Sequence, residues 1–83
     1  MLEKLKEAQN RVVGTKQVLR GLEAGRFSQV FVAEDADEFI YRRVMAAAEA
    51  AHVPACRVNT MKELGQACRV EVPTAAAALL RGE

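Results

Sequence analysis

The chain has 83 residues and a mass of about 9.1 kDa, which suffices for one domain over residues 1–83 and excludes multidomain machinery. Apolar residues make up 51% and charged residues 28%, a composition that excludes intrinsic disorder. Lys and Arg number 12 and Asp and Glu 11, so the net charge of +1, taken alone, argues against nucleic-acid binding, which usually comes with a larger basic excess.

The first part of the chain alternates helical and extended patterns. Residues 2–9 have apolar side chains three apart and predict a short helix, and residues 11–14 form a β-branched run that ends in glycine. Thr15 is the expected N-cap of a helix over residues 16–24. The β-branched and aromatic residues at 28–33 then predict a buried strand.

An acidic segment, residues 34–37, leads into a longer predicted helix. That helix covers residues 38–51, because its apolar side chains recur at helical spacing and form one stripe. Two N-caps fit the pattern: Asp35, in a capping box with Glu38, or Asp37.

The last part of the chain predicts two further strands and two further helices. Residues 55–58 form a short strand pattern, and Thr60 with Glu63 forms a capping box that opens a helix. Residues 70–72 are a short extended piece that we interpret as the fourth strand. An Ala-rich helix over residues 74–80 is expected to follow a proline.

Strands separated by helices predict crossover connections, with helices on both faces of a small sheet. The expected fold class is therefore α/β, as a three-layer α/β/α sandwich with its loops collected at the sheet edge. The N-terminus lacks the apolar run of a signal peptide, and no stretch approaches the roughly 18 apolar residues of a membrane span. We expect a cytoplasmic protein that does not enter membranes and is a monomer when free.

The segment from Gly14 to Arg20 is the first candidate site. Gly14 permits a close approach to the backbone, and Thr15 opens a helix whose N–H groups and positive dipole end favour phosphate. Lys16 and Arg20 are i,i+4 neighbours and project from one face above that end. Cations at the positive end of a helix dipole are unfavourable, and a bound anionic partner would offset this repulsion. The alternative is a solvated helix face with an ordinary cap.

The charges are unevenly distributed along the chain. Residues 1–26 hold six basic and three acidic groups, residues 27–51 two and five, and residues 52–83 four and three. The near-neutral total therefore hides a basic first segment. Of its cations we expect Lys16, Arg20 and Arg11 to lie near the candidate site.

The residue types and their spacing in the sequence do not indicate a metal site or a catalytic site. The three carboxylates of residues 34–37 suit helix capping better than a cation site, since no calcium loop is complete. His52, Cys56 and Cys68 lack the spacing of a zinc site, so we interpret the cysteines as reduced core residues. No acid–base pair or nucleophile motif is present. We therefore expect no enzyme activity, no metal and no cofactor.

A second candidate surface is the segment Val70, Glu71, Val72 and Pro73. Two β-branched residues flank a glutamate before a predicted helix. If this segment and the Gly14 turn share one end of the sheet, its apolar side chains would pack against an unstacked base. The alternative is a strand with one exposed glutamate.

Four blocks carry a resemblance that covers nearly the whole chain. They are V-V-G-T-K-Q-V-L-R-G-L (12–22), V-F-V-A-E-D-A-D (30–37), M-K-E-L-G-Q-A-C (61–68) and V-E-V-P-T-A-A-A (70–77). The chain resembles the L-seven-Ae family of kink-turn RNA-binding ribosomal proteins, particularly its small bacterial members. The resemblance implies a central four-stranded mixed sheet and binding to RNA duplexes that bend sharply at tandem sheared G·A pairs.

The family's G-x-N-E-x-x-K motif, which reads the sheared guanines, falls on Gly14 to Arg20. Lys16 takes the Asn position, Gln17 the Glu position and Arg20 the Lys position. Lys16 donates to guanine O6 or N7 but cannot accept, and Gln17 keeps an acceptor without the full charge. The small bacterial members share this Gly-Thr-Lys-Gln pattern. The resemblance also places further residues at the RNA: Thr15, Glu34, Asp35, Lys62, Val70, Glu71, Val72 and Pro73.

The expected function is non-enzymatic recognition of kink-turns by shape selection, in which the protein shifts the RNA toward its bent conformer. The bound RNA would be ribosomal RNA, a riboswitch or another structured RNA, with the ribosome as one partner. The alternative is a protein-interaction module of the same fold that has lost RNA binding.

Overall fold

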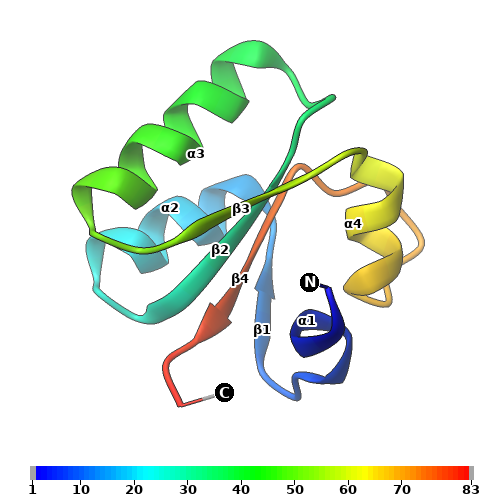
Figure 1. The fold of residues 1–83 in the computed structure, drawn as a ribbon, viewed down its shortest axis with the longest axis horizontal. Helices are drawn as coiled ribbons and strands as arrows, with labels where there is room; N and C mark the ends of the chain where they lie inside the picture. Colours follow the sequence, from blue (N-terminus) through cyan, green and yellow to red (C-terminus); the bar gives the residue numbers. More distant parts are fainter. Residues whose placement is uncertain (1, 83) are drawn as a thin grey trace.

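Four strands form the central sheet of the computed structural model, which describes residues 2–82. They are β1 (Arg11–Val13), β2 (Phe27–Ala33), β3 (Ala55–Val58) and β4 (Ala76–Leu80). Their order across the sheet is β1-β4-β2-β3 (Figure 1). β4 is antiparallel to both of its neighbours, and β2 is parallel to β3. The expected mixed four-stranded sheet is confirmed.

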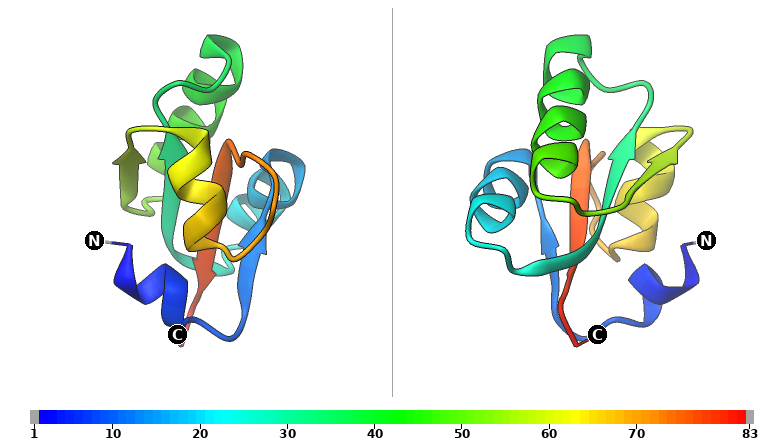
Figure 2. Two further views of the ribbon diagram at one scale, coloured as in Figure 1. Left: turned by 90° about the vertical axis from the view of Figure 1, so that its right-hand side faces the viewer. Right: turned by 60° about the vertical axis from the view of Figure 1, so that its left-hand side comes forward.

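Helices cover both faces of this sheet, which confirms the three-layer α/β/α architecture. α2 (Thr15–Glu23) and α3 (Glu38–Ala50) lie on one face, and α1 (Glu3–Glu7) and α4 (Met61–Ala67) lie on the other (Figure 2). Over the described residues 2–82, no helix combines the length and apolar character needed to cross a bilayer.

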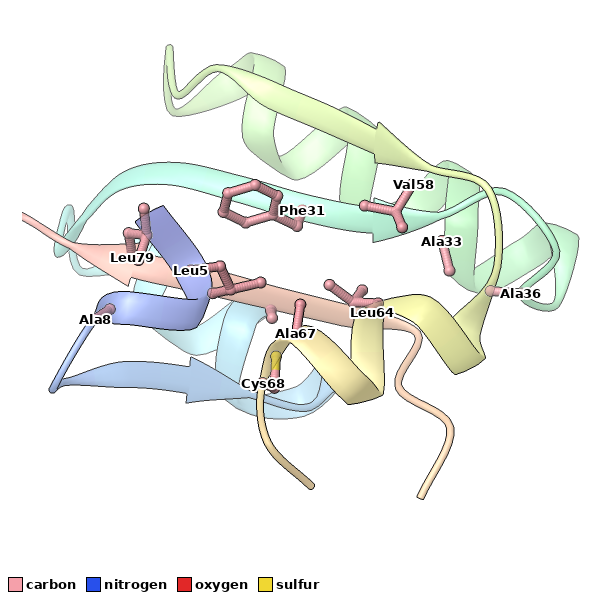
Figure 3. Close-up of a cluster of buried hydrophobic side chains, with 11 residues drawn as sticks. Leu5, Ala8, Phe31, Ala33, Ala36, Val58, Leu64, Ala67, Cys68 and Leu79 are labelled. Atoms are coloured by element: carbon pink, nitrogen blue, oxygen red, sulfur yellow. The ribbon is translucent and has the colours of Figure 1, made fainter. Parts of the chain in front are cut away.

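Each face of the sheet has its own hydrophobic core, because successive residues of a strand point to opposite faces. On β2, Val30 and Val32 pack toward α2 and α3. Phe31 and Ala33 pack toward α1 and α4, where they meet Leu5 and other buried side chains (Figure 3). Both cores consist largely of small and medium-sized aliphatic residues.

The prediction of an Ala-rich helix over residues 74–80 is wrong, because this segment contains the central strand β4. Ala76, Ala77 and Ala78 are fully buried, with β1 paired on one side and β2 on the other. A continuous apolar run also suits a strand that is covered on both faces. Pairing on both edges and burial on both faces outweigh the helix propensity of alanine.

The prediction of a fourth strand over residues 70–72 is wrong for the same reason. The sheet positions it would occupy are taken by β4, and these residues form a loop that runs beside α4. The loop is tied to α4 by backbone hydrogen bonds from Val70 N to Gly65 O (3.1 Å) and from Thr74 N to Met61 O (3.0 Å). The remaining predicted helices and strands are present, with ends that differ by at most two residues.

Candidate nucleic-acid interface

One edge of the sheet gathers most of the predicted site residues. Because β4 runs antiparallel to the other three strands, it begins where β1, β2 and β3 end. We call this edge the loop edge; it comprises residues 14–17, 34–37, 59–62 and 73–75. Backbone hydrogen bonds tie its segments together: Gly14 N to Ala76 O (2.9 Å), Ala33 N to Ala75 O (2.9 Å) and Glu34 N to Val58 O (2.7 Å).

Three helices, α2, α3 and α4, begin at the loop edge, and α3 and α4 are capped by carboxylate or hydroxyl side chains. Asp37 Oδ1 accepts from Phe39 N (2.9 Å) and Ile40 N (3.3 Å) at the start of α3. Thr60 Oγ1 accepts from Glu63 N (3.1 Å) at the start of α4, which confirms the predicted capping box on its Thr60 side. The protein therefore satisfies the positive ends of these two helices itself.

Asp35 does not cap α3; of the two predicted candidates, Asp37 does. The carboxylate of Asp35 instead accepts from Met61 N at 2.7 Å and so supplements the cap of α4. This bond joins the β2–α3 loop to the start of α4, so Asp35 has a structural partner within the loop edge. Its neighbour Glu34 is exposed at the same edge.

The start of α2 has no such cap. Its N-cap is Gly14 and not Thr15, which is the first helical residue, and no side chain accepts from the first turn. No acidic residue lies in that turn, whereas Lys16 does. An uncapped helix end presents unsatisfied N–H groups and the positive end of the dipole. Within residues 2–82, α2 is thus the loop-edge helix whose start is open to an anion.

Gly14 is required at this turn for two reasons. Its φ of 110° lies in the left-handed region that favours glycine, and a Cβ at this residue would lie 2.8 Å from Gln17 Oε1. The side chain of Gln17 therefore folds back over the Gly14 backbone. The glycine lets the amide oxygen of Gln17 sit close to the open start of the helix.

Lys16 and Arg20 are exposed on α2, and neither side chain has a hydrogen bond or ion pair to the described residues. The expectation that Arg11 lies near them is wrong. Arg11 begins β1, at the end of the strand remote from Gly14, and its guanidinium donates to Ala8 O (2.6 Å) and Cys68 O (2.9 Å). Arg11 therefore joins α1 to the end of α4.

The segment from Val70 to Pro73 divides into buried and exposed parts. Val70 packs against the core beneath α4, whereas Glu71 and Pro73 are exposed and Val72 is 64% exposed. A Cβ at Gly65 would clash with the backbone carbonyl of Val72, so the loop lies directly against α4. Val72 is therefore the apolar side chain that this loop presents to solvent.

Two other residues complete the description of the loop edge. Lys62, the second residue of α4, is exposed there; its contact with RNA is an expectation from the resemblance. Phe39, in the first turn of α3, is 71% exposed and was not predicted as a site residue. The signal in the sequence is that Phe39 lies outside the apolar stripe of its helix, which includes Ile40 and Val44.

The cysteines behave as core residues. Cys68 is buried in the cluster with Leu64, and Cys56 is half-buried on the edge strand β3. Burial raises the pKa of both thiols above their ordinary value of 9.0. No group of three or more His, Cys, Asp or Glu side chains suited to a metal ion occurs in the part of the chain that the structure describes.

Comparison with known proteins gives a consistent picture. The model of the ribosomal protein L7Ae/L30e/S12e/Gadd45 family matches residues 1–83. An RNA-binding protein from Geobacillus thermodenitrificans is 51% identical over 95% of this chain and 96% of its own length. The RNA-binding protein YbxF from Geobacillus stearothermophilus is 49% identical over the same shares of the two chains.

A solved structure agrees with these relatives. The Giardia lamblia 15.5kD RNA binding protein is 28% identical, has a TM-score of 0.86, and covers 99% of this chain and 69% of its own. The resemblance identified from the four sequence blocks is confirmed, and the family supports the expectation of a binding protein without enzyme activity. The chain belongs to the ribosomal protein L7Ae/L30e/S12e/Gadd45 family.

Proposed function

We propose that this protein binds structured RNA at kink-turns and stabilises the bent conformer. The observation that carries the proposal is the open start of α2, where an uncapped helix end lies beside Lys16, Gln17 and Arg20. Such a helix end attracts phosphate and polar base edges. The names of its relatives, which are RNA-binding proteins, support the same class of ligand.

Each residue of the α2 start has a distinct role in this proposal. Lys16 donates to guanine O6 or N7, and the amide oxygen of Gln17 accepts from guanine N–H groups. Gly14 keeps the backbone open so that the RNA approaches closely. Arg20, one turn further along α2, holds the RNA backbone.

The apolar contribution comes from the other side of the loop edge. Val72 is exposed on the loop beside α4 and would cover the nucleotides that loop out of the kink. Phe39 offers a second apolar surface, an aromatic ring that a base can stack on.

The test is a titration with a kink-turn RNA labelled for FRET and with a control in which the sheared G·A pairs are replaced by Watson–Crick pairs. We expect the kink-turn RNA to bind at least about tenfold more tightly, and its ends to approach on binding. Equal affinity for both RNAs would contradict the proposal. Crosslinking in cells would then identify which RNA carries the kink and whether the ribosome is a partner.

A protein-interaction module of the same fold is the second candidate, favoured by the exposure of Phe39 and Val72. Replacing both Lys16 and Arg20 with Ala separates the two functions. The double variant should lose RNA binding together with much of its salt dependence. A contact made by apolar side chains would be nearly unchanged.

A further inference from the structure

A shallow groove runs between α2 and α3 on the outer face of the molecule. It is lined by Thr15, Lys16, Leu19, Arg20, Glu23 and Arg43. The two helices lie side by side over one face of the sheet (Figure 1). The groove begins at the open start of α2 and continues along that helix, away from the loop edge.

Three cations meet in this groove, and Arg43 comes from a different helix than the other two. Lys16 and Arg20 are about 6 Å apart along the axis of α2, from the rise of 1.5 Å per residue. All three side chains are exposed, and none has a hydrogen bond or ion pair to the described residues. The groove contains one carboxylate, Glu23, so an excess of positive charge remains.

The neighbouring arginine on α3, Arg42, differs from Arg43 in two ways: its side chain is paired, and it lies in another groove. Arg42 donates from Nη2 to Glu38 Oε1 at 2.7 Å, and it lines a separate groove against β3 with Tyr41 and Met45. Successive residues of a helix point about 100° apart. The helix therefore presents one arginine paired within the protein and one unpaired beside the α2 cations.

We propose that the groove between α2 and α3 is a second RNA-binding surface, which holds the phosphate backbone of a duplex that flanks the kink. This inference rests on the proposed function, because the groove is continuous with the start of α2. Arg43 contacts a phosphate of that duplex, and Arg20 lines the same groove. Unpaired guanidinium groups in a row suit phosphate oxygens, which are read by charge and not by sequence.

The experiment compares Arg43→Gln with Arg42→Gln, a matched control that removes the same charge one residue away. Affinity for the kink-turn RNA is measured by fluorescence anisotropy over a salt series. Arg43→Gln should weaken binding roughly fivefold to tenfold at 0.1 M salt and reduce the magnitude of the salt slope by about 0.7–0.9. Arg42→Gln should change neither, and Arg43→Lys should retain most of the wild-type affinity.

RNA design adds a second readout. Shortening one flanking stem should abolish the difference between wild type and Arg43→Gln, whereas shortening the other should leave it intact. The inference is overturned if Arg43→Gln and Arg42→Gln behave alike, or if the Arg43 effect persists both when the first stem is shortened and when the second is. Thermal melting of both variants without RNA checks that neither change disturbs the fold.

Failure of this inference is distinguishable from failure of kink-turn recognition. If wild type binds the kink-turn RNA and its G·A-disrupted control equally while Arg43→Gln weakens both, the groove binds duplex backbone and kink recognition is wrong. If wild type prefers the kink-turn RNA and Arg43→Gln has no effect, kink recognition stands without the groove. If wild type binds neither RNA, both proposals are wrong.

Discussion

At Gly14 the backbone has a φ of 110°, and a Cβ would lie 2.8 Å from the amide oxygen of Gln17. A glycine before a helix is recognisable in the sequence, and so is its capacity for close approach. The folded-back position of the Gln17 side chain is not recognisable in the sequence, because it depends on a rotamer that is open only when residue 14 has no Cβ. The same turn explains why Thr15 is not the cap: the backbone enters the helix one residue earlier than the threonine signal indicates.

Replacing Gly14 with Ala tests this turn. We expect Gly14→Ala to lower the free energy of unfolding by about 1–3 kcal/mol through backbone strain, and to weaken RNA binding more than about tenfold by displacing Gln17. Urea unfolding and anisotropy titration measure the two effects.

Gly25→Ala is the matched control for the change at Gly14. Gly25 also has a positive φ, 68°, but a Cβ there has open space around it. This variant should lose about 1 kcal/mol of stability and keep its RNA affinity. A similar loss of affinity in both variants would show that strain alone, and not the position of Gln17, weakens binding.

Among the elements, β4 shows the limit of local patterns. Residues 76–80 read A-A-A-L-L, and nothing within that segment indicates that β1 and β2 will pair with it from both sides. The pairing is non-local, so helix propensity gives the wrong answer. By contrast, the starts of α3 and α4 were predictable, because a cap and its helix lie next to each other in the sequence.

The contact between α1 and α4 supplies a prediction at this scale. The Arg11 guanidinium reaches carbonyl oxygens at the ends of both helices, Ala8 O and Cys68 O. Arg11→Lys keeps the charge but loses the fork that spans two carbonyls, and should lower the free energy of unfolding by about 1–2 kcal/mol. Urea unfolding measures the loss.

RNA affinity should remain at the wild-type level in Arg11→Lys, because Arg11 lies at the end of β1 remote from Gly14. Arg57→Lys, an exposed arginine on the edge strand, is the control and should leave stability unchanged. If Arg11→Lys weakened RNA binding at full stability, Arg11 would belong to the interface after all.

For the whole molecule, alternation of helices and strands was enough to predict three layers, and the resemblance was enough to predict a mixed sheet. The strand order and the meeting of four segments at the loop edge depend on pairings distant in sequence. The groove between α2 and α3 was hidden for the same reason: Arg43 follows Arg20 by 23 positions and meets it only through helix packing.

The stability of the whole molecule should fall at alkaline pH through its buried thiols. Burial raises the pKa of Cys68 above 9.0, although the Arg11 guanidinium acts in the opposite direction. The unfolded chain therefore releases this proton at a lower pH than the folded protein. The stabilisation is complete below the unfolded pKa and decreases as pH rises toward the folded pKa, by at most about 1.4 kcal/mol per pH unit.

Urea unfolding of wild type and Cys68→Ala between pH 7 and about pH 10 checks this expectation. Cys68→Ala should begin less stable, because it leaves a small cavity, and should lose less stability as pH rises. Cys56→Ala serves as the comparison at a half-buried thiol. Parallel curves for wild type and Cys68→Ala would show that Cys68 does not couple folding to pH.

The caps at Asp37, Asp35 and Thr60 have a consequence for how a long polyanion settles on this protein. A strand of phosphates that reaches the loop edge meets three helix starts. Carboxylate and hydroxyl side chains of the protein already cap two of them. Competing anchor points are thus removed before the ligand arrives. A single anchor, combined with cations that extend from it in one direction, defines both where the strand begins and which way it runs.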